Sequence, residues 1–246
     1  MEKEEKIDVS IVIPAYNEER RLGPTLFAIC DYFFSLQRKS EIIVVDDGST
    51  DGTREVVSQT RKKLERYQSL CSIKLLVHNT NYGKGAAVKT GMLAARGSIL
   101  LFTDADLSTP ITEFHRLEKA LQDGADVVIG SRALPDSRII VPQPWLRRQI
   151  GRFFPFLVRK LVLPDFKDTQ CGFKAFKKET GQKLFRALKT TGFAFDVEVL
   201  LLAKKYALRI QELPVTWYNK SESKVVLWKS PWLMLKEILS LRRQRS

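Results

Sequence analysis

Two aspartates separated by one residue follow an apolar stretch of the chain. Leu100–Phe102 is hydrophobic, and Asp104 and Asp106 come shortly after it. In extended backbone the side chains at positions i and i+2 point to the same side, so these carboxylates can converge on one divalent cation. Mg²⁺ is often held by one or two carboxylates together with substrate phosphates. The alternative interpretation, a solvated turn after a strand, has to be weighed against the rest of the chain.

The elements that must position these aspartates alternate along the first half of the chain. Apolar runs separated by amphipathic segments are typical of βαβ units and predict an α/β fold with a mostly parallel central sheet flanked by helices. The predicted strands cover residues 8–13, 42–45, 73–77, 98–103 and 127–129, and the predicted helices cover residues 19–36, 53–67, 84–95 and 112–121.

Polar residues follow the ends of several of these strands. They are Pro14–Glu18, the pair Asp46–Asp47, the two aspartates after residue 103, and Gly130–Arg132. Ligands of such sheets bind beyond the carboxyl ends of the strands, so all four groups are expected at one binding edge.

The loop Gly83–Lys84–Gly85 has two interpretations. It lacks the spacing of a P-loop, and the first strand is not followed by a dinucleotide-binding glycine motif. Glycines allow a close backbone approach, and a helix N-terminus with a lysine attracts anions. The loop is therefore either a modest phosphate site or a plain helix cap.

The second half of the chain is less regular. Residues 145–161 place apolar and aromatic side chains near helical spacing with five cations among them, interrupted by Pro155. Such a helix suits a membrane interface, although a core-packing helix with a basic outer face has the same pattern. A polar loop is expected at 168–174, a helix from residue 195, a strand at 209–213 and a last amphipathic helix at 232–241.

Composition narrows the class of partner. The formal net charge of +13 over 246 residues indicates an anionic partner: a nucleic acid, an acidic membrane or a phosphorylated substrate. No nucleic-acid-binding motif accompanies the charge, so no nucleic acid is expected. No apolar run is long enough to span a membrane, and the charged first ten residues do not form a secretory signal. Three scattered cysteines predict neither disulfides nor a zinc site.

Seven segments together resemble the family 2 glycosyltransferases of the GT-A fold. Within that family they are most similar to dolichyl-phosphate β-glucosyltransferases and their polyprenyl-phosphate relatives. The segments run in the family's order and are residues 12–18, 44–53, 81–85, 104–107, 130–132, 168–174 and 195–198. The resemblance implies a GT-A nucleotide-diphospho-sugar transferase fold with a C-terminal amphipathic helical appendage.

The resemblance also implies roles on the donor side. The base and ribose of a nucleotide sugar, with UDP-glucose favoured, would contact Pro14, Tyr16, Glu18, Asp46 and Asp47. The aspartate at 104 would approach the ribose or metal, and the one at 106 would ligate Mg²⁺ or Mn²⁺ on the diphosphate. Lys84 would add positive charge beside that leaving group.

On the acceptor side the resemblance implies that Arg132 faces a lipid phosphate, with Gln170 and Lys174 nearby. Ser223 and Lys224 would belong to a late loop over the diphosphate. One departure concerns the metal: some dolichyl-phosphate mannosyltransferases have a glutamine two residues after the second aspartate, whereas this chain has Ser108.

The implied reaction is a metal-dependent, inverting hexose transfer onto dolichyl or polyprenyl phosphate. A phosphate monoester is already an anion, so it needs positioning rather than a general base, and the planar fork of an arginine suits that task. Attack opposite the leaving group converts an α-linked donor into a β-linked product.

A lipid acceptor favours the membrane interpretation of the basic helix. Each cation near an anionic leaflet contributes roughly 1 kcal/mol. We therefore expect a peripheral enzyme on the cytoplasmic face of a membrane, with a transferase domain over 1–225 that contains an interface helix at 143–163, and a basic helix at 226–246.

Three alternatives stay open from sequence. The donor could be GDP-mannose or another UDP-sugar. A saccharide acceptor would need a carboxylate base, for which Asp196 is the candidate, although Asp196 and Glu198 could equally cap their helix. A non-enzymatic basic adaptor would explain the charge but not the aspartates at the strand ends.

Overall fold

The computed structural model describes residues 6–140 and 162–218. Its order of elements is β1 Val9–Ala15, α1 Leu22–Ser35, β2 Ser40–Asp46, α2 Thr53–Lys63, η1 Glu65–Tyr67, β3 Cys71–Val77, α3 Lys84–Ala94, β4 Ile99–Thr103, η2 Ile111–Glu113, α4 Phe114–Gln122, β5 Val127–Ser131, β6 Arg138–Ile139, β7 Phe173–Lys177, α6 Lys178–Ala187, α7 Phe195–Lys205, β8 Ile210–Pro214 and β9 Thr216–Trp217.

Seven strands form one sheet in the order β3-β2-β1-β4-β7-β5-β8. All neighbouring strands are parallel except at β7, which runs antiparallel to β4 and β5. The predicted α/β fold with a mostly parallel sheet is thus confirmed. A separate two-stranded sheet joins β6 and β9.

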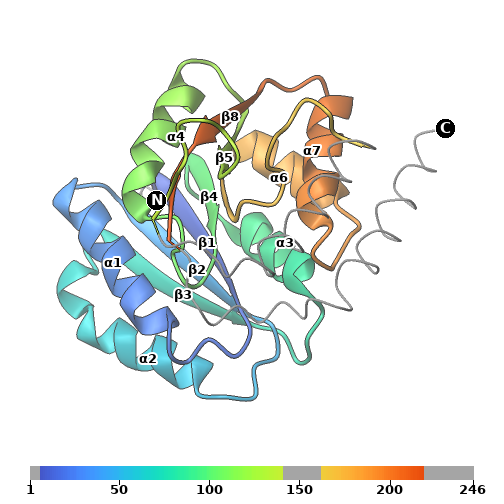
Figure 1. Cartoon of the computed structure of the whole chain (residues 1–246). Helices are drawn as coiled ribbons and strands as arrows, with labels where there is room; N and C mark the ends of the chain where they lie inside the picture. The colour runs from blue at the N-terminus through green and yellow to red at the C-terminus, as the bar shows by residue number, and fades with distance from the viewer. Residues whose placement is uncertain (1–5, 141–161, 219–246) are drawn as a thin grey trace, which may run out of the picture.

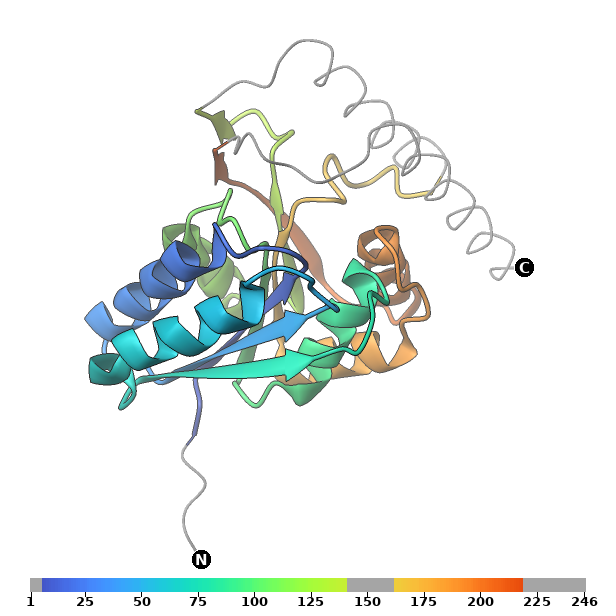
Figure 2. The same ribbon diagram turned by 90° about the horizontal axis from the view of Figure 1, so that it is seen from below.

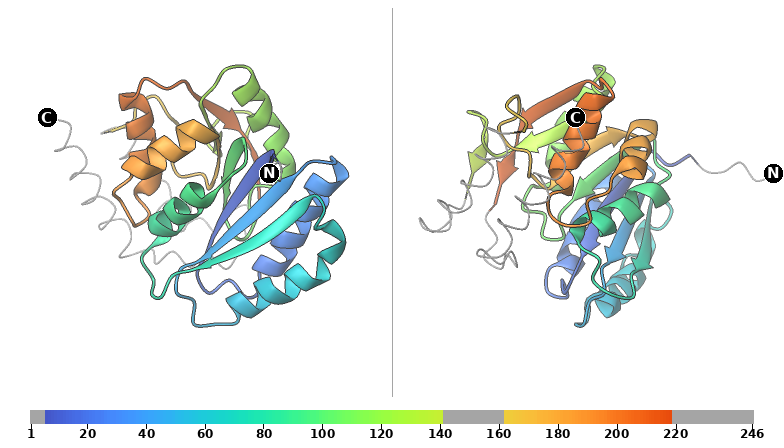
Figure 3. Two further views of the ribbon diagram at one scale, coloured as in Figure 1. Left: turned by 180° about the vertical axis from the view of Figure 1, so that it is seen from behind. Right: turned by 90° about the vertical axis from the view of Figure 1, so that its right-hand side faces the viewer.

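Helices cover both faces of the sheet (Figures 1 and 2). Helices α1, α2 and α4 pack on one face, where Ile11 and Ile13 of β1 are buried. Helices α3, α6 and α7 pack side by side on the other face, where Val12 is buried (Figure 3). Buried side chains therefore alternate between two hydrophobic cores, as the period of a strand requires.

The sequence analysis missed β7 and α6. It expected a polar loop up to residue 174, because Lys174 and Lys177 make Phe173–Lys177 look polar. In the structure Lys174 is buried and ion-paired, and Phe173, Ala175 and Phe176 fill the core. Because β7 is antiparallel, its first residue lies beside Thr103, the last residue of β4. The loop before β7 is consequently delivered to the carboxyl edge of the parallel strands.

Several expectations lie wholly or partly outside the described residues. These are the helix at 145–161, most of the interface segment 143–163, the late loop with Ser223 and Lys224, and the appendage at 226–246. Val162 and Leu163, at the end of the interface segment, are buried in the second core. Within residues 6–140 and 162–218, no helix is both long and apolar enough to cross a bilayer.

Candidate active site

A cleft of about 370 Å³ opens at the carboxyl edge of the sheet. Its wall is built from the loops after β1, β2 and β4 and from the start of α3. Seven residues that the sequence analysis assigned to the donor or the metal line it: Pro14, Tyr16, Glu18, Asp47, Lys84, Asp104 and Asp106. The structure therefore brings together side chains that lie up to 92 positions apart in the chain.

The two aspartates after β4 reach the cleft by a route that differs from the predicted one. The strand ends at Thr103, and the N–H of Leu107 donates to the carbonyl of Asp104 at 3.2 Å, which closes a turn. Leu107 has a φ of 46°, in the left-handed region. Asp106 accepts a hydrogen bond from the N–H of Ser108 at 2.9 Å. A turn, rather than extended backbone, thus directs both carboxylates into one cleft.

Asp104 is held between two groups. Its Oδ1 lies 2.7 Å from the ammonium of Lys84, and its N–H donates to the carbonyl of Gly172 at 3.2 Å. A Cβ on Gly172 would lie 2.0 Å from Asp104 Oδ2, so glycine is required for this close approach. The loop before β7 therefore fixes the position of one carboxylate of the cleft.

The pair of aspartates fits a divalent cation that is completed by a ligand's phosphates. Both supply the oxygen atoms that Mg²⁺ and Mn²⁺ prefer, and both line the cleft. The part of the chain that the structure describes contains no group of three or more His, Cys, Asp or Glu residues that could hold a metal without further ligands. A site with two carboxylates suits a metal that arrives with a diphosphate.

The two aspartates at the carboxyl end of β2, Asp46 in the strand and Asp47 directly after it, support the loops around the cleft. Asp46 is fully buried and accepts hydrogen bonds from Arg54 Nε at 2.6 Å and the N–H of Ser49 at 3.3 Å. The structure therefore places Asp46 behind the cleft wall rather than on its surface, because Arg54 and Ser49 draw the carboxylate toward the start of α2.

Asp47 anchors the loop that carries Lys84. Its carboxylate accepts hydrogen bonds from the N–H groups of Tyr82 and Gly83 at 3.0 and 2.8 Å and from His78 Nδ1 at 2.7 Å. Gly83 has a φ of 103°, and a Cβ there would meet the carbonyl of Thr191 at 2.5 Å. This backbone places the N-terminus of α3 and the Lys84 ammonium at the cleft.

Electrostatics keep Lys84 charged. Burial alone would lower its pKa, but the carboxylates of Asp104 and Asp196 outweigh the desolvation and raise it. A permanent cation at a helix N-terminus is suited to stabilising negative charge on a diphosphate.

Sequence reasoning missed Arg21, which also lines the cleft. Its Nε and Nη2 donate to the two carboxylate oxygens of Glu18, both at 2.7 Å, and its Nη1 lies 3.7 Å from Asp106. Only the i,i+3 spacing of Glu18 and Arg21 could have indicated this pair. Phe193, from the loop before α7, was also missed and lines the cleft.

Arg132, directly after β5, is bound to Asp168. The guanidinium donates from Nε at 2.7 Å and from Nη2 at 2.9 Å, and the backbone N–H of Arg132 donates at 3.0 Å to the same carboxylate. Burial alone would raise the pKa of Asp168, but Arg132 outweighs it and lowers the pKa to about 2. Asp168 lies in the segment 168–174 of the family resemblance, which implies no role for it.

Lys174 is directed into the protein. Its side chain is 1% exposed and donates to Asp196 Oδ1 at 2.5 Å and to the carbonyl of Cys171 at 2.6 Å. The sequence analysis assigned Lys174 to the acceptor, whereas the structure places its ammonium on Asp196, because a buried lysine requires a counter-charge. Burial raises the pKa of Asp196, and Lys174 opposes that shift.

Glu198 and Gln170 differ in burial: Glu198 lies inside the protein, and Gln170 lies partly at the surface. Glu198 is buried and accepts hydrogen bonds from the N–H groups of Lys189 and Thr190 at 3.0 and 2.7 Å. It therefore supports the loop before α7. Gln170 is partly exposed, and its N–H donates to Asp168 Oδ1 at 3.1 Å.

A three-layer α/β fold with a carboxylate-lined cleft at the carboxyl edge of its sheet is characteristic of GT-A glycosyltransferases. The model of the family described as "Glycosyl transferase family 2" matches residues 10–185. The chain belongs to this family and is a glycosyltransferase.

The chain is similar in sequence to curated relatives over almost its whole length. It is 37% identical to a dolichyl-phosphate β-glucosyltransferase of Dictyostelium discoideum, over 97% of this chain and 75% of the relative. It is 38% identical to the enzyme of the same name from Drosophila melanogaster, over 96% of this chain and 74% of that relative. The corresponding human protein is 35% identical, over 95% and 74%.

Solved structures support the fold. Mannosyl-3-phosphoglycerate synthase from Rubrobacter xylanophilus superposes with a TM-score of 0.71 at 19% identity, covering 97% of this chain and 75% of that one. Glucosyl-3-phosphoglycerate synthase from Mycobacterium tuberculosis, solved with Mn²⁺ and UDP-glucose, gives a TM-score of 0.67 at 19% identity, covering 95% and 78%.

Proposed function

We propose that this glycosyltransferase moves glucose from UDP-glucose onto dolichyl phosphate or another polyprenyl phosphate, with inversion at the anomeric carbon and with Mg²⁺ or Mn²⁺. The names of its curated relatives support the sugar and the lipid phosphate. A structural neighbour bound to Mn²⁺ and UDP-glucose supports the donor and the metal.

On the donor side, the cleft would bind the nucleotide between the loops after β1 and β2 and the start of α3. Asp104 and Asp106 would hold the cation, which neutralises charge on the departing diphosphate. Lys84 and the N–H groups at the start of α3 would stabilise the same charge, because it grows on the β-phosphate as the bond to glucose breaks.

On the acceptor side, one observation carries the proposal. Asp196, the candidate base for a hydroxyl acceptor, is 4% exposed, and its carboxylate accepts a hydrogen bond from Lys174 at 2.5 Å. A general base must lie within hydrogen-bond reach of the proton that it removes. A phosphate monoester is already ionised and does not need that base, so the arrangement favours a phosphate acceptor.

Arg132 is the proposed partner of the acceptor phosphate. The side chain of Arg132 is about one-third exposed. Asp168 fixes the orientation of its guanidinium. An arginine fork held in this way can aim a phosphate oxygen at the anomeric carbon, opposite the leaving group, which gives a β-linked product from an α-linked donor.

We also propose that the enzyme docks as a peripheral protein on the cytoplasmic, anionic face of a membrane. The net charge of +13 supports this, as do the exposed side chains of Ile139 and Ile140 directly before residues 141–161. Apolar side chains next to cations are typical of interfacial binding. The assignments of the transferase domain to 1–225 and of a basic helix to 226–246 remain proposals.

A donor panel tests the function. The purified protein is incubated with polyprenyl phosphate in detergent and with UDP-glucose, UDP-galactose or GDP-mannose, with Mg²⁺, Mn²⁺ or a chelator. We expect glucosyl lipid only with UDP-glucose and a metal. Faster transfer from GDP-mannose would overturn the donor, and undiminished transfer in chelator would overturn the role of the metal.

A further inference from the structure

The guanidinium of Arg132 contacts two side chains, Asp168 and Trp217. Asp168 accepts hydrogen bonds from its Nε at 2.7 Å and from Nη2 at 2.9 Å, and the carbon Cζ lies 5.8 Å from the ring centre of Trp217. Trp217 belongs to β9, which is far from β5 in the chain. The carboxylate and the aromatic ring together leave the arginine little freedom to change rotamer.

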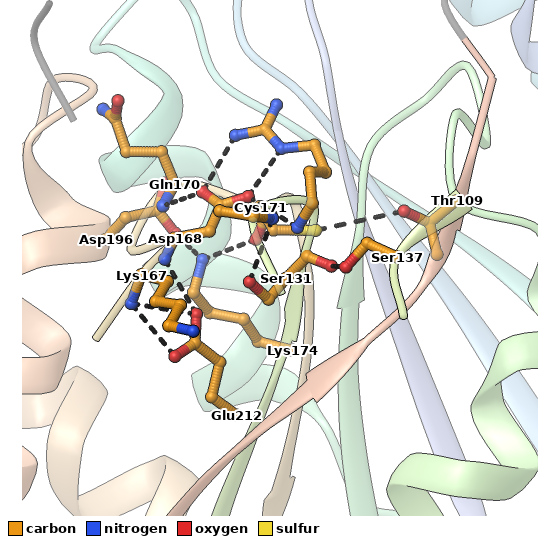
Figure 4. Close-up of polar contacts among 12 residues, drawn as sticks. Thr109, Ser131, Ser137, Lys167, Asp168, Gln170, Cys171, Lys174, Asp196 and Glu212 are labelled. Atoms are coloured by element: carbon orange, nitrogen blue, oxygen red, sulfur yellow. Dashed lines mark hydrogen bonds and ion pairs between the residues drawn. The ribbon is translucent and has the colours of Figure 1, made fainter. Parts of the chain in front are cut away.

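Asp168 is itself anchored from a third element. Glu212, in β8, accepts a hydrogen bond from the N–H of Asp168 at 2.8 Å and two from the N–H of Lys167 at 3.0 and 3.1 Å. Glu212 lies beside Ile129 of β5 in the sheet, three residues before Arg132. Figure 4 shows Asp168 between Glu212 and Gln170. The sheet thus sets both the arginine and the loop that orients it.

This pairing restricts how the arginine can bind an anion. An arginine has five N–H donors in a fixed planar fork. Asp168 occupies the edge formed by Nε and one N–H of Nη2. The end formed by Nη1 and the second N–H of Nη2 remains outside that contact and can bind two oxygens of a phosphate.

We propose that Asp168 is a positioning residue for the acceptor: it holds Arg132 so that the lipid phosphate is bound end-on, and Glu212 holds Asp168. This inference rests on the proposed function, because it assumes that Arg132 meets the acceptor phosphate. It predicts that Asp168 affects the acceptor and not the nucleotide, although the same loop contacts Asp104 through Gly172.

The variant Asp168→Asn separates the two sides. An amide keeps the shape and one acceptor oxygen but loses the charge that orients the guanidinium. We expect the Kd for a short isoprenyl phosphate, measured by calorimetry, to rise about 10-fold or more. We expect the Kd for UDP with Mn²⁺ to change less than about 2-fold, which is below the effect of one hydrogen bond.

A matched control lies at the opposite end of β5. Asp126 forms an ion pair with Lys177 at 3.0 Å and accepts a hydrogen bond from the N–H of Arg209 at 3.1 Å. Asp126→Asn should leave both dissociation constants unchanged. If it weakens isoprenyl phosphate binding as much as Asp168→Asn does, the effect is general to the fold and the inference is overturned.

Arg132→Lys gives a second, independent variant should Asp168→Asn fold poorly. Lysine keeps the charge but cannot bind both oxygens of Asp168 and a phosphate in one plane. The same selective loss of isoprenyl phosphate binding is expected. In an Arg132→Gln background, Asp168→Asn should add less than about 2-fold, because residues that act together are non-additive.

The outcomes distinguish this inference from the proposed function. Failure of the wild-type protein to bind isoprenyl phosphate overturns the proposed acceptor, and with it the inference. Normal wild-type binding, with equal losses of isoprenyl phosphate and UDP in Asp168→Asn, overturns only the positioning role. If the effects of Arg132→Gln and Asp168→Asn on isoprenyl phosphate binding are fully additive, the positioning role is likewise overturned.

Discussion

The ammonium of Lys84 lies 2.7 Å from Oδ1 of Asp104, so the first residue of α3 and the first residue after β4 form an ion pair at the cleft. This pair joins the helix terminus proposed to bind the diphosphate to the aspartates proposed to hold the metal. It places a fixed positive charge next to the position at which negative charge would develop on a leaving diphosphate.

Lys84→Met should lower kcat by about 10²-fold, because removal of one preorganised group that stabilises developing charge typically has an effect of this size. Steady-state transfer of glucose to polyprenyl phosphate measures it. Lys89→Met, on the same helix, is the control, since Lys89 donates to the carbonyl of Leu188 instead. Equal losses in both variants would contradict a specific role for Lys84.

Asp106→Asn should abolish metal-dependent transfer while the fold is retained. The amide can still accept the hydrogen bond from the N–H of Ser108, so the turn is preserved, but a neutral oxygen is a poorer ligand for a hard cation. Calorimetry of UDP binding with and without Mn²⁺ should show that the variant loses the metal-dependent gain in affinity. Asp123→Asn, at an exposed position after α4, should keep it.

Gly172→Ala should displace Asp104, because the new Cβ would lie 2.0 Å from Oδ2. We expect Mn²⁺-dependent UDP binding to weaken by about 10-fold or more, the size of effect expected when a charged hydrogen-bonding group is misplaced. Gly23→Ala is the matched control: it lies in α1, where the nearest atom would be 3.4 Å from the Cβ and alanine favours the helix. Unchanged UDP affinity in Gly172→Ala would contradict the proposed arrangement.

Asp168 should contribute to stability in a pH-dependent way. The pKa of its carboxyl is about 2 in the folded protein, against about 3.9 in an unfolded chain. The ionised group therefore stabilises the fold above about pH 4, by roughly 2 to 3 kcal/mol, and this contribution disappears as the pH falls from about 4 through 2.

Urea unfolding of the wild type and of Asp168→Asn, measured across that range, checks the sign. The wild type should lose more stability than the variant as the pH falls, so that the difference between them narrows. A difference that is constant from about pH 5 to 2 would show that Asp168 does not titrate with the folded-state pKa described here.

The alternation of strands and helices predicts most of the fold from sequence because parallel strands buried on both faces are continuous apolar runs, as in Ile42–Val45. β7 runs antiparallel and is also buried, but it shows no such apolar run because the buried Lys174 interrupts it. Lys174 is compatible with the core only because Asp196, from α7, neutralises it. That contact spans 22 positions and leaves no periodic signal in either segment.

The residues of the candidate site also fall into two groups: those that the sequence predicts and those that it does not. Asp104, directly after β4, and Lys84, at the end of the loop that follows β3, could be predicted because the topology alone brings them to one edge. Arg21 and Asp168 could not, because their importance comes from specific partners: Glu18 for the first and Arg132 for the second. A sequence shows which side chains are available, and only the packed loops show which of them pair.

The most direct test of the account compares three acceptors with UDP-glucose and Mn²⁺: polyprenyl phosphate, the corresponding polyprenol, and a short water-soluble saccharide. Glucose transfer to the phosphate alone is expected, because the Asp196 carboxylate is buried and hydrogen-bonded to Lys174 rather than open to an acceptor hydroxyl. Comparable transfer to polyprenol or to the saccharide would contradict it.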